Sequence, residues 1–351
     1  MASSIGISLL GGTGYGAGEL LRLLVNHPNV TVTSVVSSSA ANTPISSVHR
    51  HLSGFYDSNF ASSIHWDELE LFTHRFLVTA LPHGTSGATI RDLIDDAEAH
   101  GVKIIDLSGD IRLEDPTQRS IYYPEAKVSD ELQSRFVYGL TELQREKISS
   151  AMHIANPGCY ATLCALSAAP IVQRDMHQDS IIFDGKSGSS GAGRALAASF
   201  HHPERHANVN AYKILSHRHE PEIRQALGDP AGSRISTAFV PHVIPISRGM
   251  YVTAFMTLRA DTEVAEIVSL YRSFYQDSPF VRVLDTPVEL SSVVGSNFCD
   301  LSISVRGRQL VVTGALDNLV KGMTGQAIQN MNLQAGIPET TGLWFPAVSP
   351  V

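Results

Sequence analysis

A cysteine that follows a sharp turn near the middle of the sequence has surroundings that favour nucleophilic chemistry. The turn is Asn156-Pro157-Gly158-Cys159, and a helical pattern runs over Thr162–Val172. A cysteine at a helix N-terminus faces the positive end of the helix dipole, which stabilises the thiolate. The alternative for Cys159 is a buried structural cysteine, a description that fits Cys164 within the helical pattern. Spacing alone leaves both interpretations of Cys159 open.

A glycine-rich segment near the N-terminus predicts a dinucleotide site. It lies between an apolar run, Ile5–Leu10, and a helical pattern, Glu19–Val25. Its candidate contact residues are Gly11, Gly12, Thr13, Gly14, Tyr15, Gly16 and Ala17. The segment fits the G-x-G-x-x-G/A fingerprint, in which backbone N–H groups at a helix N-terminus hold a pyrophosphate. The alternative is a tight turn without a ligand, but the strand before it and the helix after it favour cofactor binding.

The residues after the second expected strand, Thr31–Val36, bear on which dinucleotide fits. They are Ser37, Ser38 and Ser39. A carboxylate at this position would bind the ribose 2′-hydroxyl of NAD and repel a 2′-phosphate. Serine hydroxyls can instead donate hydrogen bonds to that phosphate, so the sequence favours NADP(H) as cofactor.

Composition argues against several other classes of protein. The chain has 351 residues, a formal net charge of −8 and no run of Lys or Arg, so no nucleic-acid partner is expected. Its cysteines, Cys159, Cys164 and Cys299, match no zinc spacing, and His201-His202 has no third ligand nearby, so no metal is expected. No segment approaches the roughly 20 apolar residues of a membrane span, and no signal peptide is recognisable. We therefore expect a cytoplasmic protein without a membrane partner.

The elements that must position these residues fall into two groups. Up to about residue 157, apolar strands alternate with helices, which is typical of a parallel sheet covered on both faces. After residue 160, closely spaced strands favour a mainly antiparallel sheet. The expected strands are Ile5–Leu10, Thr31–Val36, Phe76–Leu81, Val102–Leu107, Ser180–Phe183, Ile235–Val240, Tyr251–Leu258, Leu301–Val305 and Gln309–Gly314. The expected helices are Glu19–Val25, Ala88–His100, Thr162–Val172, Asp261–Asp277 and Asn318–Gln334. The predicted fold is an α/β Rossmann-type NADP-binding domain plus an α+β domain.

Six motifs in a fixed order make the sequence similar to a known family. They are Gly11–Leu24, Asn156–Cys159, Ser187–Arg194, His217–Ile223, Pro245–Gly249 and Asp317–Gly322. Together they resemble the N-acetyl-γ-glutamyl-phosphate reductases of arginine biosynthesis over essentially the whole chain. That family is related to aspartate-β-semialdehyde dehydrogenase. One departure is Met323, which stands where the family often has alanine and is expected to alter packing near the cofactor.

The resemblance implies a reaction and an architecture. The Cys159 thiolate would attack the γ-acyl phosphate, phosphate would leave, and hydride from NADPH would reduce the thioester to N-acetylglutamate semialdehyde. The cofactor domain would be discontinuous, 1–157 plus 319–351, with the catalytic and oligomerisation domain 158–318 inserted. Family members assemble through the sheet of the inserted domain, so a homodimer or homotetramer is expected.

Further site residues complete the prediction. His219 is the first choice for the acid–base and His217 the second, and Glu222, three residues along a helix, could orient the imidazole. The additional cofactor contacts expected are Pro82, His83, Ser187, Gly188 and Asn318. The expected substrate ligands are Arg112, Asn156, Ser189, Gly191, Arg194, Tyr212 and Arg248. A guanidinium suits phosphate, so Arg112 is expected there, with a salt bridge to Asp110 or Glu114 as the alternative.

Two other functions compete with this interpretation. His201–Arg205 and Pro338–Leu343 are also similar to a sister family of lysine biosynthesis, which reduces an aminoadipyl phosphate held on a carrier protein. Gly191–Arg194 and Asn156–Cys159 look more like the arginine-pathway family, whereas a basic groove beside Cys159 would reverse the preference. A non-catalytic NADP-sensing protein would have no need of a reactive Cys159, and the presence of the histidine and arginine motifs argues against it.

Overall fold

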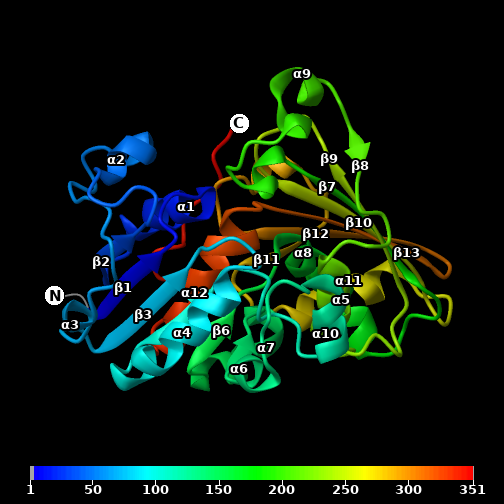
Figure 1. Ribbon diagram of the computed structural model, residues 1–351. Coiled ribbons are helices and arrows are strands. Elements are labelled where there is room, and N and C mark those ends of the chain that lie inside the picture. Colours follow the sequence, from blue (N-terminus) through cyan, green and yellow to red (C-terminus); the bar gives the residue numbers. More distant parts are fainter. Residues whose placement is uncertain (1–3, 351) are drawn as a thin grey trace. The chain divides into compact units, whose positions relative to one another are not determined.

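The computed structural model describes residues 4–350. They divide into two compact units, each built on one sheet (Figure 1). Unit 1 contains the described residues up to Pro157 and the segment Met323–Trp344, and unit 2 contains Gly158–Gly322 and the described residues from Phe345 on. The predicted domain limits, 1–157 with 319–351 and 158–318, stay predictions.

Unit 1 holds a six-stranded sheet with the order β2-β1-β3-β4-β6-β5, in which every pair is parallel. Its strands are β1 (Ile5–Leu10), β2 (Val30–Val36), β3 (His74–Thr79), β4 (Lys103–Asp106), β5 (Phe136–Tyr138) and β6 (His153–Ala155). Its helices are α1 (Tyr15–Leu24), α2 (Ile45–Val48), η1 (Arg50–Leu52), α3 (Trp66–Leu69), α4 (Ser86–Ala99), α5 (Pro116–Tyr122), α6 (Asp130–Ser134), α7 (Thr141–Ser150) and α12 (Gly325–Gln334). The predicted parallel sheet is confirmed.

The strand order of unit 1 indicates where a cofactor would bind. Because β2 and β3 lie on opposite sides of β1, the chain reverses its direction of travel there, and ligands of such sheets bind at this switch point beside the carboxyl ends of the strands. The ends of β1 and β3 stay close, since the amide of Ala80 donates to the carbonyl of Leu10 at 2.7 Å. The glycine-rich loop and the loop after β3 therefore begin side by side.

Helix α12 docks in unit 1 through buried amide side chains. Nδ2 of Asn330 donates to the carbonyl of Gly139 at 2.8 Å, and Nε2 of Gln334 donates to the carbonyl of Ala151 at 2.9 Å. Oδ1 of Asn332 accepts from Nε2 of His27 at 2.9 Å, and Nδ1 of that ring accepts from the amide of Asn29. These bonds satisfy polar groups that would be costly to bury alone.

Unit 2 holds a seven-stranded mixed sheet with the order β11-β12-β13-β10-β7-β9-β8. Its strands are β7 (Ile181–Ser187), β8 (Asn210–Ala211), β9 (Thr237–Val243), β10 (Met250–Thr257), β11 (Val281–Leu284), β12 (Cys299–Arg306) and β13 (Gln309–Leu316). The pairs β7–β9 and β11–β12 are parallel and the other pairs are antiparallel, so the predicted mainly antiparallel sheet is confirmed.

Three helices pack on this sheet: α8 (Cys159–Gln173), α10 (His219–Ala226) and α11 (Val264–Phe274). A short helix, α9 (His202–Arg205), packs on η3 instead, and 3₁₀ turns occur at η2 (Ser189–Ala192), η3 (Ala198–Phe200) and η4 (Leu290–Ser292). Pro170 lies inside α8 and has no N–H to offer the carbonyl of Leu166. The hydroxyl of Tyr275 donates to that carbonyl at 2.5 Å instead, which satisfies the buried acceptor.

The last helical pattern differs from the prediction. The sequence indicates one helix over Asn318–Gln334, but a π-helical turn, η5 (Val320–Thr324), comes first and α12 begins only at Gly325. The carboxylate of Asp317 accepts from the amides of Leu319 and Val320 at 2.8 and 3.0 Å. These bonds fix the start of the turn, so Asn318 precedes the helical segment rather than opening an α-helix. None of the helices formed by residues 4–350 has the length and apolar character needed to cross a membrane.

Candidate active site

Cys159 is the first residue of α8, and the turn before it is fixed by a buried carboxylate. Oε1 of Glu222, on α10, accepts a hydrogen bond from the amide of Gly158 at 2.6 Å. Glu222 has no exposed surface. The carbonyl of Gly158 accepts from the amide of Thr162 at 2.9 Å, which starts the helix. Cys159 itself is half-buried and forms no disulfide, so its thiol lies at the positive end of the α8 dipole.

The backbone of η5 lies against the nucleophile. A Cβ atom added to Gly322 would be 2.7 Å from the Cβ of Cys159, a separation at which something must move. Only glycine therefore fits here without displacing Cys159. Gly322 belongs to a motif that the sequence singled out, but no role was predicted for it, because a single glycine after a lysine does not reveal a steric role.

Two buried histidines lie close together in unit 2. The rings of His217 and His219 are 4.7 Å apart between centroids and nearly perpendicular, and Tyr160 contacts both edgewise. Nδ1 of His217 accepts from the amide of His219 at 3.1 Å, so its proton is on Nε2. Burial, with Arg218 and Lys213 nearby, lowers the pKa of His217 to about 3. His217 is therefore neutral at physiological pH.

Tyr212 belongs to the same surroundings. Its ring is 5.5 Å from that of His217. Burial, and then the Cys159 thiol when negatively charged, raise the pKa of the Tyr212 hydroxyl. The hydroxyl group therefore stays protonated, and it lies close enough to Cys159 for the two groups to interact electrostatically. Lys213 and Leu215, which follow it, adopt left-handed backbone angles of φ 44° and 53°. Residues held in this sparsely populated region often mark functional sites.

Asn318 connects two loops of unit 2 that were predicted to bind ligands. Its Oδ1 accepts from the amide of Gly249 at 2.7 Å, and its Nδ2 donates to Oγ of Ser190 at 3.0 Å. The amide of Gly188 donates to the carbonyl of Gly249 at 2.9 Å. Ser187 is buried at the end of β7 and Ser189 is half-buried. The loop after β7 is thus fixed at its base, and its cofactor and substrate contacts stay predictions.

Arg248 forms an ion pair with a buried carboxylate, whereas Arg194 lies on an exposed part of its loop. Nε of Arg248 forms an ion pair with the fully buried Asp317 at 2.7 Å, and Nη2 donates to the same carboxylate at 3.3 Å. Asp317 also accepts from the amide of Gly295 at 2.6 Å. Arg194 and Gly191 are exposed, beyond the fixed base of the loop. The ion pair with Asp317 gives the Arg248 guanidinium a structural role. The sequence did not indicate this contact.

In unit 1, Arg112 and Asn156 hold the other end of the turn. Nε of Arg112 donates to the carbonyl of Asn156 at 2.6 Å, and Nη2 donates to that of Leu107 at 2.8 Å. Arg112 is buried. Nδ2 of Asn156 donates to the carbonyl of Met323 at 2.9 Å, and Oδ1 accepts from Asn330 at 3.3 Å. These contacts give both residues a structural role; substrate binding by either stays a prediction.

The glycine-rich loop after β1 has the shape of a phosphate cradle. Gly11 has φ 92°, and a Cβ there would lie 2.7 Å from the carbonyl oxygen of Ala80. Gly14 is the N-cap of α1 and has no side-chain cap, and open space surrounds the position of its missing Cβ. The N–H groups of the first turn of α1 point toward this end. The loop therefore fits a pyrophosphate at the positive end of α1.

The other predicted cofactor contacts lie around this loop in unit 1. Pro82 and His83 are exposed in the loop after β3, and Nδ1 of His83 accepts from the amide of Gly109 at 2.8 Å. Ser38 and Ser39 are exposed after β2, whereas Ser37 is buried and its Oγ accepts from the amide of Ala40 at 3.2 Å.

Four more loop residues were predicted to contact the cofactor. Ala17 is fully buried, Tyr15 is exposed, and Thr13 and Gly16 are half-buried. A Cβ on Gly16 would lie 2.8 Å from Sδ of Met323. Met323, at the position where the family often has alanine, therefore lies against the loop, and its effect on packing near the cofactor stays a prediction.

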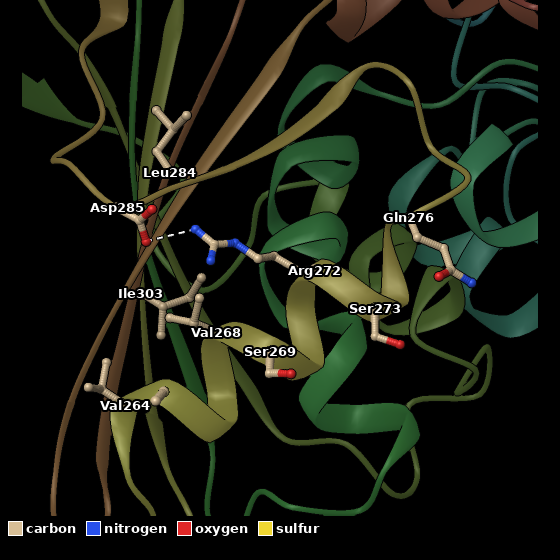
Figure 2. A pocket seen from close by; sticks show the side chains of 10 residues that line it. Val264, Val268, Ser269, Arg272, Ser273, Gln276, Leu284, Asp285 and Ile303 are labelled. Atoms are coloured by element: carbon tan, nitrogen blue, oxygen red, sulfur yellow. Dashed lines mark hydrogen bonds and ion pairs between the residues drawn. The ribbon is translucent and has the colours of Figure 1, made fainter.

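A separate pocket in unit 2 takes no part in this arrangement. It lies between α11 and the strands β11 and β12, and Arg272 points across it to an ion pair with Asp285 at 2.7 Å (Figure 2). The lining includes Val264, Val268 and Ile303 and none of the predicted site residues. Within residues 4–350, no group of three or more His, Cys, Asp or Glu side chains could hold a metal ion.

Two family models match this chain, one mainly over unit 1 and the other over unit 2. Residues 6–151 match the family model described as semialdehyde dehydrogenase, NAD binding domain, and residues 159–318 match the model for the dimerisation domain of the same enzymes. Aspartate semialdehyde dehydrogenase II from Vibrio cholerae, complexed with ASA, has a TM-score of 0.69 at 13% identity, covering 95% of this chain and 99% of that one. The enzyme from Candida albicans, solved with NADP, has a TM-score of 0.67 at 13% identity, with 96% and 99% covered. The two models place this chain in the semialdehyde dehydrogenase class of proteins, with an NAD(P)-binding domain and a dimerisation domain, and the solved structures show the same fold.

Closer relatives narrow the family. N-acetyl-gamma-glutamyl-phosphate reductases from Methanosarcina barkeri and Archaeoglobus fulgidus are each 42% identical, covering 97% and 98% of this chain and 98% and 99% of their own lengths. The reductase from Symbiobacterium thermophilum is 41% identical, with 97% of both chains covered. The chain belongs to the N-acetyl-γ-glutamyl-phosphate reductase family, and it is an oxidoreductase.

Proposed function

We propose that this chain reduces N-acetyl-γ-glutamyl phosphate to N-acetylglutamate semialdehyde and phosphate, with NADPH, through a thioester on Cys159. The observation that carries the mechanism is the position of Cys159 as the first residue of α8, after a turn held by Glu222. The names of the relatives favour this substrate over an aminoadipyl phosphate on a carrier protein.

The first half of the reaction needs only the nucleophile. The Cys159 thiolate attacks the γ-carbonyl carbon, a C–S bond forms, the C–O bond to phosphate breaks, and phosphate leaves. A thioester accepts hydride more readily than a carboxylate, so the covalent step divides one difficult reduction into two easier ones. When bound, NADPH supplies the hydride. Collapse of the resulting thiohemiacetal returns the electron pair to the Cys159 sulfur and releases the aldehyde.

His219 is the acid–base in this proposal. It protonates the developing alkoxide of the thiohemiacetal and takes the proton back when the C–S bond breaks. His217 is less suited to this exchange, because its low pKa keeps it neutral and its Nδ1 is occupied by the His219 amide. It serves instead as a hydrogen-bond donor through Nε2. Glu222 acts on the turn before Cys159, and an additional role in orienting His219 remains part of the proposal.

Substrate binding is assigned to the exposed end of the loop after β7. We assign the substrate carboxylate to Arg194, with Gly191 beside it, because Asp317 already holds Arg248. The phenolic O–H of Tyr212 donates a hydrogen bond to the substrate near Cys159. The phosphate group is assigned to Arg112, although that side chain would have to exchange a carbonyl partner to bind it.

The cofactor preference is assigned to NADP(H). The exposed Ser38 and Ser39 offer hydroxyls and no carboxylate at the end of β2, so a 2′-phosphate meets donors rather than a negative charge. The match to a dimerisation domain supports a homodimer or a homotetramer. A cytoplasmic location is also part of the proposal.

The test is the reverse reaction. Wild type, mixed with N-acetylglutamate semialdehyde, NADP and phosphate, should form NADPH at 340 nm, and Cys159→Ser should not. Cys164→Ser, the neighbouring buried thiol, is the matched control and should retain activity. A folded wild type that binds NADP but is inactive would refute the substrate assignment, and activity in the Cys159 variant would refute the thioester.

A further inference from the structure

We propose that His49 is a positioning residue for the dinucleotide, which it serves by holding the carbonyl of Gly12 in the glycine-rich loop. The inference rests on the proposed binding of NADPH and adds to it a residue outside the loop. His49 lies between α2 and η1, more than thirty residues after Gly12 in the sequence, and it was not among the residues predicted to contact the cofactor.

The imidazole makes a directed contact with the loop. Nε2 of His49 lies 2.7 Å from the carbonyl oxygen of Gly12, and the side chain is buried. A carbonyl oxygen can only accept, so the proton of the bond is on Nε2. A short hydrogen bond inside a buried site is stronger than one exposed to water, and an unmatched acceptor there is costly.

The helix leaves room for this ring at one glycine. A Cβ on Gly18, in α1, would lie 2.6 Å from Nδ1 of His49 and 2.9 Å from Cε1. The middle of a short, stiff side chain cannot move aside as the end of a long one can. The absence of a side chain at Gly18 thus permits the imidazole to lie between α1 and the loop. The ring of Phe60, 6.3 Å away between centroids, borders it as well.

The contact fixes the peptide that leads into the phosphate cradle. The amide of Gly12 donates to the carbonyl of Val36 at 3.0 Å, so both backbone polar groups of Gly12 are engaged. Glycine peptides rotate easily when unrestrained. Without His49, the Gly12 carbonyl could turn toward the site, where its partial negative charge would repel a pyrophosphate. Holding that carbonyl away from the site leaves the N–H groups after Gly14 to meet the phosphates.

The experiment measures NADPH affinity by fluorescence titration in four variants. His49→Phe keeps a ring and removes the donor, and we expect its Kd for NADPH to rise roughly tenfold. His49→Gln places an amide N–H near the position of Nε2 and should restore most of the affinity. Gly18→Ala pushes the imidazole aside without changing it and should weaken binding as well. His65→Phe, at an exposed histidine of the same unit, is the control and should bind as wild type.

Two further readouts separate positioning from general damage. Alkylation of Cys159 by iodoacetamide without cofactor should be unchanged in every variant, and KM for NADPH should rise more than kcat falls. If His49→Phe fails to fold, Gly18→Ala and His49→Gln still decide the question. Wild-type affinity in both His49→Phe and Gly18→Ala would overturn the inference, as would equal weakening by Phe and Gln. Failure of wild type itself to bind NADPH would instead refute the proposed function.

Discussion

The carboxylate of Glu222 accepts a hydrogen bond at 2.6 Å from the amide of Gly158, the residue immediately before Cys159. A buried acidic side chain on α10 thus orients the peptide that presents the nucleophile at the start of α8. Glu222 therefore acts on the nucleophile through placement, and the charge of a carboxylate one residue from Cys159 is a second effect that substitution can separate from it.

The first prediction separates these two effects of Glu222. Glu222→Gln keeps an acceptor for the Gly158 amide and removes the charge, so kcat should change only a few-fold. Glu222→Ala leaves a buried amide without its partner and should lower kcat by roughly tenfold or more. Steady-state kinetics and the rate of Cys159 alkylation against pH provide the measurement. Equal losses in the two variants would mean that the charge, rather than the placement, matters.

The second prediction concerns the glycine against the nucleophile. In Gly322→Ala, a methyl group added to the wild-type backbone would lie only 2.7 Å from the Cβ of Cys159, so one of the two must move. We expect kcat to fall by at least about tenfold, since a small misplacement of a reacting atom is expensive. Kd for NADPH should stay within about twofold, which is the internal control. A variant with normal kcat would show that the turn relaxes without moving Cys159.

The third prediction follows from the lowered pKa of His217. The folded chain keeps this residue neutral down to about pH 3, whereas the unfolded chain protonates it near 6.5. Between these values the unfolded state binds one more proton, so the free energy of unfolding falls as pH drops, by about 1.4 kcal/mol per pH unit from this residue. Above pH 6.5 it contributes no slope.

Urea unfolding at pH 7, 6 and 5 tests this slope. His217→Phe should be less stable than wild type at pH 7, because the His219 amide loses its acceptor. Its stability should then decline less steeply than that of wild type as the pH is lowered. His202→Gln, at an exposed histidine, should follow the wild-type slope. Parallel curves for His217→Phe and wild type would contradict the buried, neutral state of this residue.

The fourth prediction is a double-mutant cycle in α8. Tyr275→Phe removes the hydroxyl that satisfies the carbonyl of Leu166, and should cost about 1–2 kcal/mol of stability. Pro170→Ala restores an N–H that can reach the same carbonyl. In that background, Tyr275→Phe should cost measurably less, with a coupling of at least about 0.5 kcal/mol in denaturant unfolding. Additive effects would show that Tyr275 contributes by packing alone.

The sequence predicts the main elements well, because their patterns are local. The run Ile5–Leu10 has the same bounds as β1, and Gln309–Gly314 corresponds to β13, which continues to Leu316. The helical pattern of Thr162–Val172 lies within α8, although α8 already begins at Cys159. The pattern of Asn318–Gln334 misleads, because hydrophobic spacing does not distinguish a π-helical turn from an α-helix over five residues.

The site is less predictable, because hydrogen-bond partners come from distant segments. Glu222 lies three residues after His219 in the sequence, which indicates a helical pair, but no local pattern indicates that its carboxylate also accepts from the distant amide of Gly158. Arg112 is of the type that binds phosphate, but backbone carbonyls occupy its guanidinium. Nothing around His49 indicates a contact with Gly12, since only the folded sheet brings them together.

The buried amides of α12 determine more than stability. Apolar contacts are not directional, so a helix held by them alone can shift its register at a smaller cost than one held by buried hydrogen bonds. Asn330 and Gln334 instead require the carbonyls of Gly139 and Ala151 at fixed separations, so a shift of one residue would leave several buried groups unmatched. The hydrogen bonds therefore allow only one register for the helix. Substitutions that replace these amides by apolar side chains should make the register less specific, even where they increase the buried apolar area.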